Sequence, residues 1–201
     1  MNAELDVKSV ARNVWQDTVR DGLMELFMGL YLLLTGIIIL ADMTALFILL
    51  MVFISPVVRK MKERYTHPRI GYVKSSEAEK NMGKKILAAL VGGVIALALV
   101  VLLSSENEKT QALYQWVPLL PALILAVALF IIGGRTGFLR YHIMAIFSLA
   151  AGVAVPLLGL TERMDSIAAY LLITGPVLLL WGAVVFLTFL RTYPVRAEEA
   201  G

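Results

Sequence analysis

The first residues able to carry chemistry are the carboxylates Asp17, Asp21 and Glu25, which recur at four-residue intervals into the first long apolar run. On one continuous helix this spacing places all three on one face, where like charges repel each other. A carboxylate near the lipid boundary is costly unless a cation or a hydrogen-bond donor holds it. We therefore predict that Asp21 or Glu25 pairs with an arginine.

The richest source of cations is the polar segment 59–85, which holds nine basic and three acidic residues, a net charge of +6 (9 − 3). Arg69 is the predicted partner and Arg64 the second choice, because Pro68 restricts the backbone beside Arg69. A guanidinium can also hold a carboxylate with two parallel hydrogen bonds. Such an ion pair would pin the segment against the helices and create a fixed surface. Besides the arginines, the predicted surface comprises His67, Pro68, Gly71 and Tyr72.

The lysines of the same segment predict attraction to anionic lipid headgroups, at about 1 kcal/mol for each cation near a membrane surface. The residues predicted to do this are Lys60, Lys62, Lys80, Lys84 and Lys85. This chemistry needs no cofactor, and it offers no basis for binding nucleic acid.

A second candidate site lies among the last three apolar runs, where prolines free backbone carbonyls and hydroxyl side chains lie nearby. These groups would line a cavity that opens outward and admits a small molecule. The predicted lining residues are Ser148, Pro156, Thr174 and Pro176. Proline is ordinary in membrane helices, so simple kinking is the competing interpretation.

The residue types give little support for metal binding, enzyme catalysis or ion-coupled transport. The chain has no cysteine, and neither His67 nor His142 has acidic residues at ligand spacing, so no metal site is predicted. Nothing supplies a nucleophile, a base and an orienting group together, which argues against an enzyme. Ionisable side chains are scarce inside the apolar runs, which argues against proton-coupled or ion-coupled transport.

The elements that must position these residues are membrane spans. Hydrophobic residues make up 59% of the 201 residues and charged residues only 16%, against about 25% charged residues in soluble domains. We predict an all-α fold, a six-span transmembrane helix bundle that forms a single transmembrane domain, 1–201. An amphipathic surface helix, 3–20, precedes the spans. The predicted spans are 23–41, 45–60, 86–103, 116–133, 142–160 and 166–190.

Within 59–85, the sequence predicts that Arg59 and Lys60 continue the second span and that helix ends at His67-Pro68. A residue before proline is biased toward extended conformations, so 69–73 is expected to be extended. Helix is expected to resume at Ser76, where Ser76 and Glu79 have capping-box spacing.

The basic residues predict the orientation. Sixteen of the eighteen lie on one side of the six-span arrangement, and only Lys109 and Arg163 lie on the other. Because basic loops stay inside, both termini and segment 59–85 are predicted to be cytoplasmic, in a prokaryotic-type inner membrane.

Two short motifs carry a resemblance. Asp21-Gly22-Leu23-Met24-Glu25, together with Pro68-Arg69-Ile70-Gly71-Tyr72-Val73, resembles small, uncharacterised bacterial integral membrane proteins. The likeness is confined to the N-terminal part of the chain. It implies that segment 59–85 is a fixed feature, and it implies no activity.

Two functions follow from these observations. The first is a non-enzymatic membrane module that binds a partner protein or anionic lipid through its basic cytoplasmic segment. The alternative is a small-molecule transporter or channel that uses a cavity among the last three spans. The sequence leaves the oligomeric state open.

Overall fold

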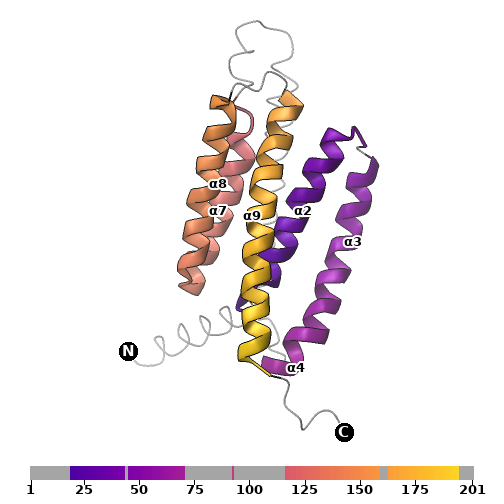
Figure 1. Ribbon diagram of the computed structural model, residues 1–201, viewed down its shortest axis with the longest axis vertical. Coiled ribbons are helices and arrows are strands. Elements are labelled where there is room, and N and C mark those ends of the chain that lie inside the picture. Colours follow the sequence, from indigo (N-terminus) through magenta and orange to yellow (C-terminus); the bar gives the residue numbers. More distant parts are fainter. Residues whose placement is uncertain (1–18, 44, 71–91, 93–115, 159–162, 195–201) are drawn as a thin grey trace, which may run out of the picture. The chain divides into compact units, whose positions relative to one another are not determined.

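A computed structural model describes residues 19–43, 45–70, 92, 116–158 and 163–194, and every regular element within them is a helix (Figure 1). The elements are α2 (Leu23–Leu40), α3 (Ala45–Met61), the π-helical turn η1 (Lys62–Thr66), α4 (His67–Ile70), α7 (Leu119–Thr136), α8 (Leu139–Leu157) and α9 (Arg163–Thr192). The predicted all-α class is confirmed for this part of the chain. Nearly all of the predicted surface helix, 3–20, and of the third span, 86–103, lies outside the described residues, so the number of spans stays a prediction.

Four helices are long and apolar enough to cross a membrane, namely Leu23–Leu40, Leu119–Thr136, Leu139–Leu157 and Ser166–Thr192. The shorter α3 has 17 residues, and it continues through Arg59 and Lys60 as predicted. Long basic side chains at a helix end can lay their aliphatic stems along lipid while the charge reaches the interface.

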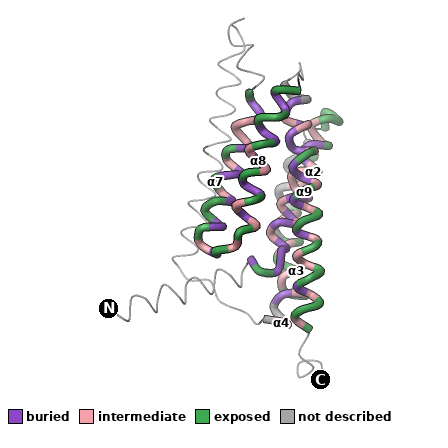
Figure 2. The backbone as a smooth tube through the Cα atoms, turned by 60° about the vertical axis from the view of Figure 1, so that its left-hand side comes forward, coloured by how far each residue is buried: buried purple, intermediate pink, exposed green. Residues whose placement is uncertain are grey.

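Apolar side chains cover the outer faces of these helices. On α9, Leu180, Val184 and Leu187 recur at intervals of four and three residues, and they are 67%, 64% and 55% exposed. Figure 2 shows how exposed residues recur along the helices. An exposed apolar stripe at helical spacing would be a liability in water, and it is what a lipid-facing surface requires.

The chain divides into two compact units. The first comprises residues 1–73, 135–137 and 175–201, and the second comprises 74–134 and 138–174. Among the described elements, the first unit contains α2, α3, η1, α4 and the C-terminal half of α9. The second contains most of α7, α8 and the N-terminal half of α9.

Glycines join α2 to the second half of α9 within the first unit. Gly22 and Gly29 lie seven residues apart, as do Gly175 and Gly182, so each pair repeats after about two helical turns. A methyl group on Gly29 would lie 2.7 Å from the carbonyl oxygen of Gly175, and one on Gly175 would lie 2.6 Å from the backbone nitrogen of Leu33. The two backbones therefore touch, which is possible only because these residues have no side chain.

The second unit is built on a tight hairpin of α7 and α8. The chain between α7 and α8 turns at Gly137, which is assigned to the first unit and whose φ of +73° is a left-handed conformation that glycine adopts without strain. Gly152 of α8 packs directly on the side chain of Ala122 of α7. Nearer the turn, the ring of His142 covers Gly133 and meets Phe130 edge to face, with ring centres 5.3 Å apart.

Residues 62–70 are helical, although the sequence predicts a break at His67-Pro68 and an extended chain after it. That prediction is wrong as far as Ile70, because the helix widens into the π-helical turn Lys62–Thr66 just before the proline. In a regular α-helix the proline ring would clash with the carbonyl four residues earlier, and a wider turn relieves this clash. Pro68 then lies in the first turn of α4, where its missing N–H costs little.

Candidate functional site

The candidate site is built around Asp21, which is fully buried at the start of α2. One carboxylate oxygen accepts a hydrogen bond from the backbone N–H of Leu23, at 3.1 Å. The other accepts a hydrogen bond from the hydroxyl of Thr66, at 2.7 Å. Helix starts leave N–H groups without partners, and a short acidic side chain just before the helix satisfies one of them. Asp21 therefore links the start of α2 to the end of η1, 45 residues further along the chain.

Gly22 makes this arrangement possible. It has a φ of +73°, and α2 begins only after it. Val185 of α9 packs against Gly22 and leaves no room for a side chain there. A methyl group on Gly22 would lie 2.7 Å from a side-chain carbon of Val185. The chain turns at Gly22, so Asp21 and Glu25 do not share the face of one continuous helix. The acidic stripe predicted from their spacing is therefore interrupted between these two residues.

Glu25 is also fully buried, in the first turn of α2. Negative side chains are favoured there because the backbone dipoles of a helix leave partial positive charge at its N-terminus. Both carboxylates are thus withdrawn from the surface of the first unit.

Of the two carboxylates predicted to pair with Arg69, Asp21 is held by Thr66 instead, and a pairing of Glu25 stays a prediction. The Arg69 guanidinium instead donates to the backbone carbonyl of Tyr65, at 2.7 Å. The physical reason is the unexpected helix through 62–70, which brings Thr66 to Asp21 and leaves Arg69 one turn further on. The guanidinium of the second predicted partner, Arg64, lies over the ring of Tyr65, 5.6 Å from its centre.

Aromatic rings join this end of the first unit to α9. The ring of Tyr65 meets Phe186 edge to face, with centres 5.9 Å apart. The guanidinium of Arg20 lies 4.9 Å from the ring centre of Tyr193, just beyond the end of α9. Contacts between a cation and an aromatic face are worth about 0.5–1 kcal/mol at exposed sites. The start of α2 and the η1–α4 segment therefore both contact the last turns of α9.

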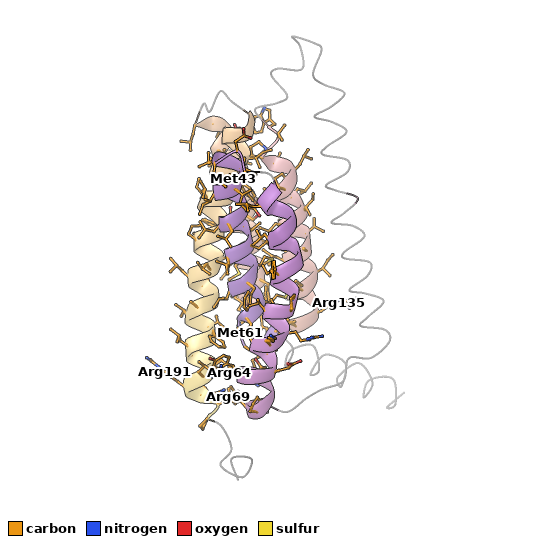
Figure 3. The ribbon with its side chains drawn as sticks, turned by 90° about the vertical axis from the view of Figure 1, so that its right-hand side faces the viewer. Met43, Met61, Arg64, Arg69, Arg135 and Arg191 are labelled. Carbon is orange, nitrogen blue, oxygen red and sulfur yellow. The ribbon has the colours of Figure 1, made fainter. Side chains whose placement is uncertain are left out.

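Cations are exposed where the carboxylates are buried. The exposed basic residues at this end are Arg20, Arg59, Lys60, Arg64 and Arg191. Figure 3 shows Arg64, Arg69 and Arg191 at one end of the first unit and Met43 at the other. Glu63, which forms a loose ion pair with Arg59 at 3.7 Å, is the exposed acid of η1. The name basic surface is used below for the five exposed cations Arg20, Arg59, Lys60, Arg64 and Arg191.

The other predicted surface and lipid-binding residues divide into two groups. Lys62 is half-buried and has contacts within the protein, and His67 and Pro68 lie in α4. The remaining predicted residues, Gly71, Tyr72, Lys80, Lys84 and Lys85, lie outside the described part of the chain.

In the second unit, one of the hydroxyls predicted to line a cavity meets the hydroxyl of a tyrosine. The hydroxyl of Tyr170 lies 2.8 Å from that of Ser148, whereas the hydroxyl of Thr174, one helical turn further along α9, has no hydrogen-bond partner among the described residues. Ser148 also contacts the backbone carbonyl of Ala122 on α7, at 3.1 Å. All three hydroxyl residues are fully buried. The hydroxyls of Ser148 and Tyr170 thus link α7, α8 and α9, and contact between helices accounts for these two without a ligand.

Tyr170 and Thr66 are the site residues that sequence reasoning missed. Tyr170 stands four residues before Thr174, a spacing that places both on one helical face and could have revealed it. No comparable signal existed for Thr66, because the predicted break at His67-Pro68 concealed its helical face. Pro156 lies in the last turn of α8, and Pro176 belongs to the first unit. A cavity among these residues stays a prediction.

The described residues contain no group of three or more His, Cys, Asp or Glu able to hold a metal ion. No known protein family, curated protein or solved structure gives a significant match to the chain. Its class therefore rests on its own helices, which define an α-helical membrane protein. More particularly, it is a protein that buries two carboxylates at one end of a helical unit and exposes cations there.

Proposed function

We propose that the protein is a non-enzymatic module of the membrane that binds anionic phospholipid headgroups through the basic surface. The observation that carries this proposal is the separation of charge at one end of the first unit. Five cations are exposed beside one exposed acid, Glu63, while Asp21 and Glu25 are 0% exposed. A surface arranged in this way attracts anions.

The physical basis is electrostatic attraction at the interface. Each Lys or Arg near an anionic membrane surface contributes about 1 kcal/mol, and salt screens this term over about 8–10 Å. Tyr193 supports the placement of this end of the first unit at the membrane interface, because aromatic rings with a polar tip favour the headgroup level of a bilayer. An acidic surface of a partner protein is the competing ligand that the experiment below must separate.

Neutralising the cations is expected to remove the preference for anionic lipid. The variant R59Q/K60Q/R64Q should lower the association constant for anionic over zwitterionic lipid by about two powers of ten at most, from about 1 kcal/mol per cation. The measurement compares spin-labelled phosphatidylglycerol with spin-labelled phosphatidylcholine at the purified protein in mixed vesicles.

The matched control is R59K/R64K, which keeps each charge and should keep the preference. The preference of the wild-type protein should also fall as salt is raised. An unchanged preference in the glutamine variant would reject lipid binding by this surface and leave the acidic partner protein as the ligand to seek.

We further propose that the basic surface faces the cytoplasm, in a six-span arrangement within a prokaryotic-type inner membrane. The distribution of basic residues along the sequence supports this orientation. Because the chain has no cysteine, single substitutions can be labelled without background. In intact cells, a membrane-impermeant maleimide should label Met43→Cys and should reach Lys60→Cys only after lysis. The reverse pattern would overturn the orientation.

A further inference from the structure

One cation of the basic surface continues an apolar stripe on α9. The exposed residues Val177, Leu180, Val184 and Leu187, here called the α9 stripe, recur at alternating intervals of three and four residues. Arg191, which is also exposed, takes the next place in this series. Residues three and four apart are neighbours on a helix surface, and all five belong to the first unit. An exposed apolar face therefore ends in a positive charge.

The guanidinium of Arg191 is not engaged within the described part of the chain, where no hydrogen bond, ion pair or ring contact involves it. It projects away from the helices of the first unit (Figure 3). The other arginines of the basic surface have contacts. Arg20 and Arg64 lie over tyrosine rings, and Arg59 pairs loosely with Glu63.

The hydroxyls next to Arg191 on α9 bond to their own helix. Thr188 donates to the backbone carbonyl of Val184, at 2.8 Å, and Thr192 donates to that of Thr188, at 2.9 Å. Arg191 is therefore the residue that offers free donors at this end of the α9 stripe. A guanidinium can hold a phosphate with two parallel hydrogen bonds. The ligand that fits this face has a long apolar body and a phosphate at one end.

We infer that α9 binds an anionic phospholipid, with an acyl chain along the α9 stripe and the phosphate on Arg191. This inference rests on the proposed function and deepens it, because it names the cation that holds the headgroup and the face that holds the chain. A second copy of the protein is the competing occupant of the stripe. Two copies with the same orientation in the membrane would bring their Arg191 side chains together, and like charges across an interface are unfavourable.

Trp181 can report on this site. It is 41% exposed, and it is a surface neighbour of the stripe because it lies four residues after Val177 and three before Val184. It precedes Arg191 by ten residues, about 15 Å along the helix, which is about half the thickness of the hydrocarbon core of a bilayer. With the phosphate at Arg191, the end of the acyl chain therefore reaches Trp181.

Quenching of Trp181 fluorescence measures the occupancy of the site. The chain has three tryptophans, so the full-length variant W15F/W116F retains Trp181 alone. In mixed vesicles, phosphatidylglycerol brominated near its chain ends should quench Trp181 at a lower mole fraction than phosphatidylcholine brominated in the same way. Adding R191Q should lower this preference about fivefold, which corresponds to about 1 kcal/mol for one cation near an anionic surface.

The matched control is R59Q in the same single-tryptophan protein. It removes the same charge, but from α3 and not from the end of the α9 stripe, so the preference at Trp181 should stay close to that of the unsubstituted protein. An equal fall in R59Q and R191Q, or no fall in R191Q, would overturn the inference. Absence of quenching by either lipid would also overturn it, because a second copy of the chain would then cover the stripe.

The failure of this inference can be distinguished from the failure of the proposed function, because R59Q/K60Q/R64Q leaves Arg191 in place. If that variant loses the overall preference for phosphatidylglycerol while R191Q keeps the preference at Trp181, the proposed function stands and the site on α9 is rejected. If R59Q/K60Q/R64Q keeps the overall preference while R191Q loses the preference at Trp181, the wider basic surface is rejected as a lipid site and the site on α9 stands.

Discussion

Replacing Gly182 with alanine is expected to destabilise the first unit by about 3 kcal/mol, at the upper end of the cost of overpacking a well-packed contact. The added methyl would lie 2.6 Å from the Cα atom of Leu26 and 2.8 Å from the carbonyl carbon of Glu25. Both are backbone atoms of α2, so no side chain can rotate away to make room. The two helices must separate along the whole stretch that the four glycines hold together.

Thermal unfolding of the purified protein in detergent, followed by circular dichroism and size-exclusion chromatography, measures this loss. The matched control is Gly134→Ala on α7, where a methyl would have no atom within 4 Å. Because alanine favours helix over glycine by up to about 1 kcal/mol, the control should be neutral or slightly stabilising. Equal stability of the two variants would contradict close backbone packing at Gly182.

Replacing Asp21 with alanine is the second large effect, with an expected loss of about 1.5–5 kcal/mol from two separate costs. Removing a side chain that caps a helix start costs about 0.5–2 kcal/mol, and leaving a buried hydroxyl without a partner costs about 1–3 kcal/mol. The first term concerns the N–H of Leu23 and the second the hydroxyl of Thr66. The same unfolding measurement applies.

Asp21→Asn is the informative comparison for this position. Its amide oxygen can accept from the Leu23 N–H, and its amide nitrogen can donate to the Thr66 oxygen. Asn should therefore recover most of the stability lost in the alanine variant. If Asn and Ala were equally destabilised, the charge of Asp21 would matter more than its two hydrogen bonds, and a cation would have to be its partner.

The glycine contacts and the Asp21 bond act on the same helices. Gly22 turns the chain so that Asp21 can cap α2, and it also lies against Val185 of α9. A larger residue at this position would be strained by the positive φ and obstructed by α9. The candidate site therefore depends on close helix packing as well as on its polar groups.

The sequence by itself determined the membrane class and most of the helices. Hydropathy and helical length are local properties, so the first apolar run could be placed at 23–41 before α2 was seen at Leu23–Leu40. The extension of α3 through Arg59 and Lys60 followed in the same way, because an apolar stretch too short for a bilayer recruits flanking basic residues. The sequence also identified Asp21 and Glu25 as carboxylates in need of a partner.

Only the tertiary structure decided what the partner of Asp21 is. The choice of Thr66 over Arg69 depends on the turn at Gly22 and on the π-helical turn before Pro68, two backbone features that pattern and propensity do not predict. The roles of Gly29 and Gly182 were also hidden, because spaced glycines gain meaning only when two particular helices are known to be neighbours. Sequence periodicity reports which face of a helix is apolar, whereas the partner of a buried polar group is decided by contacts between residues far apart in the chain.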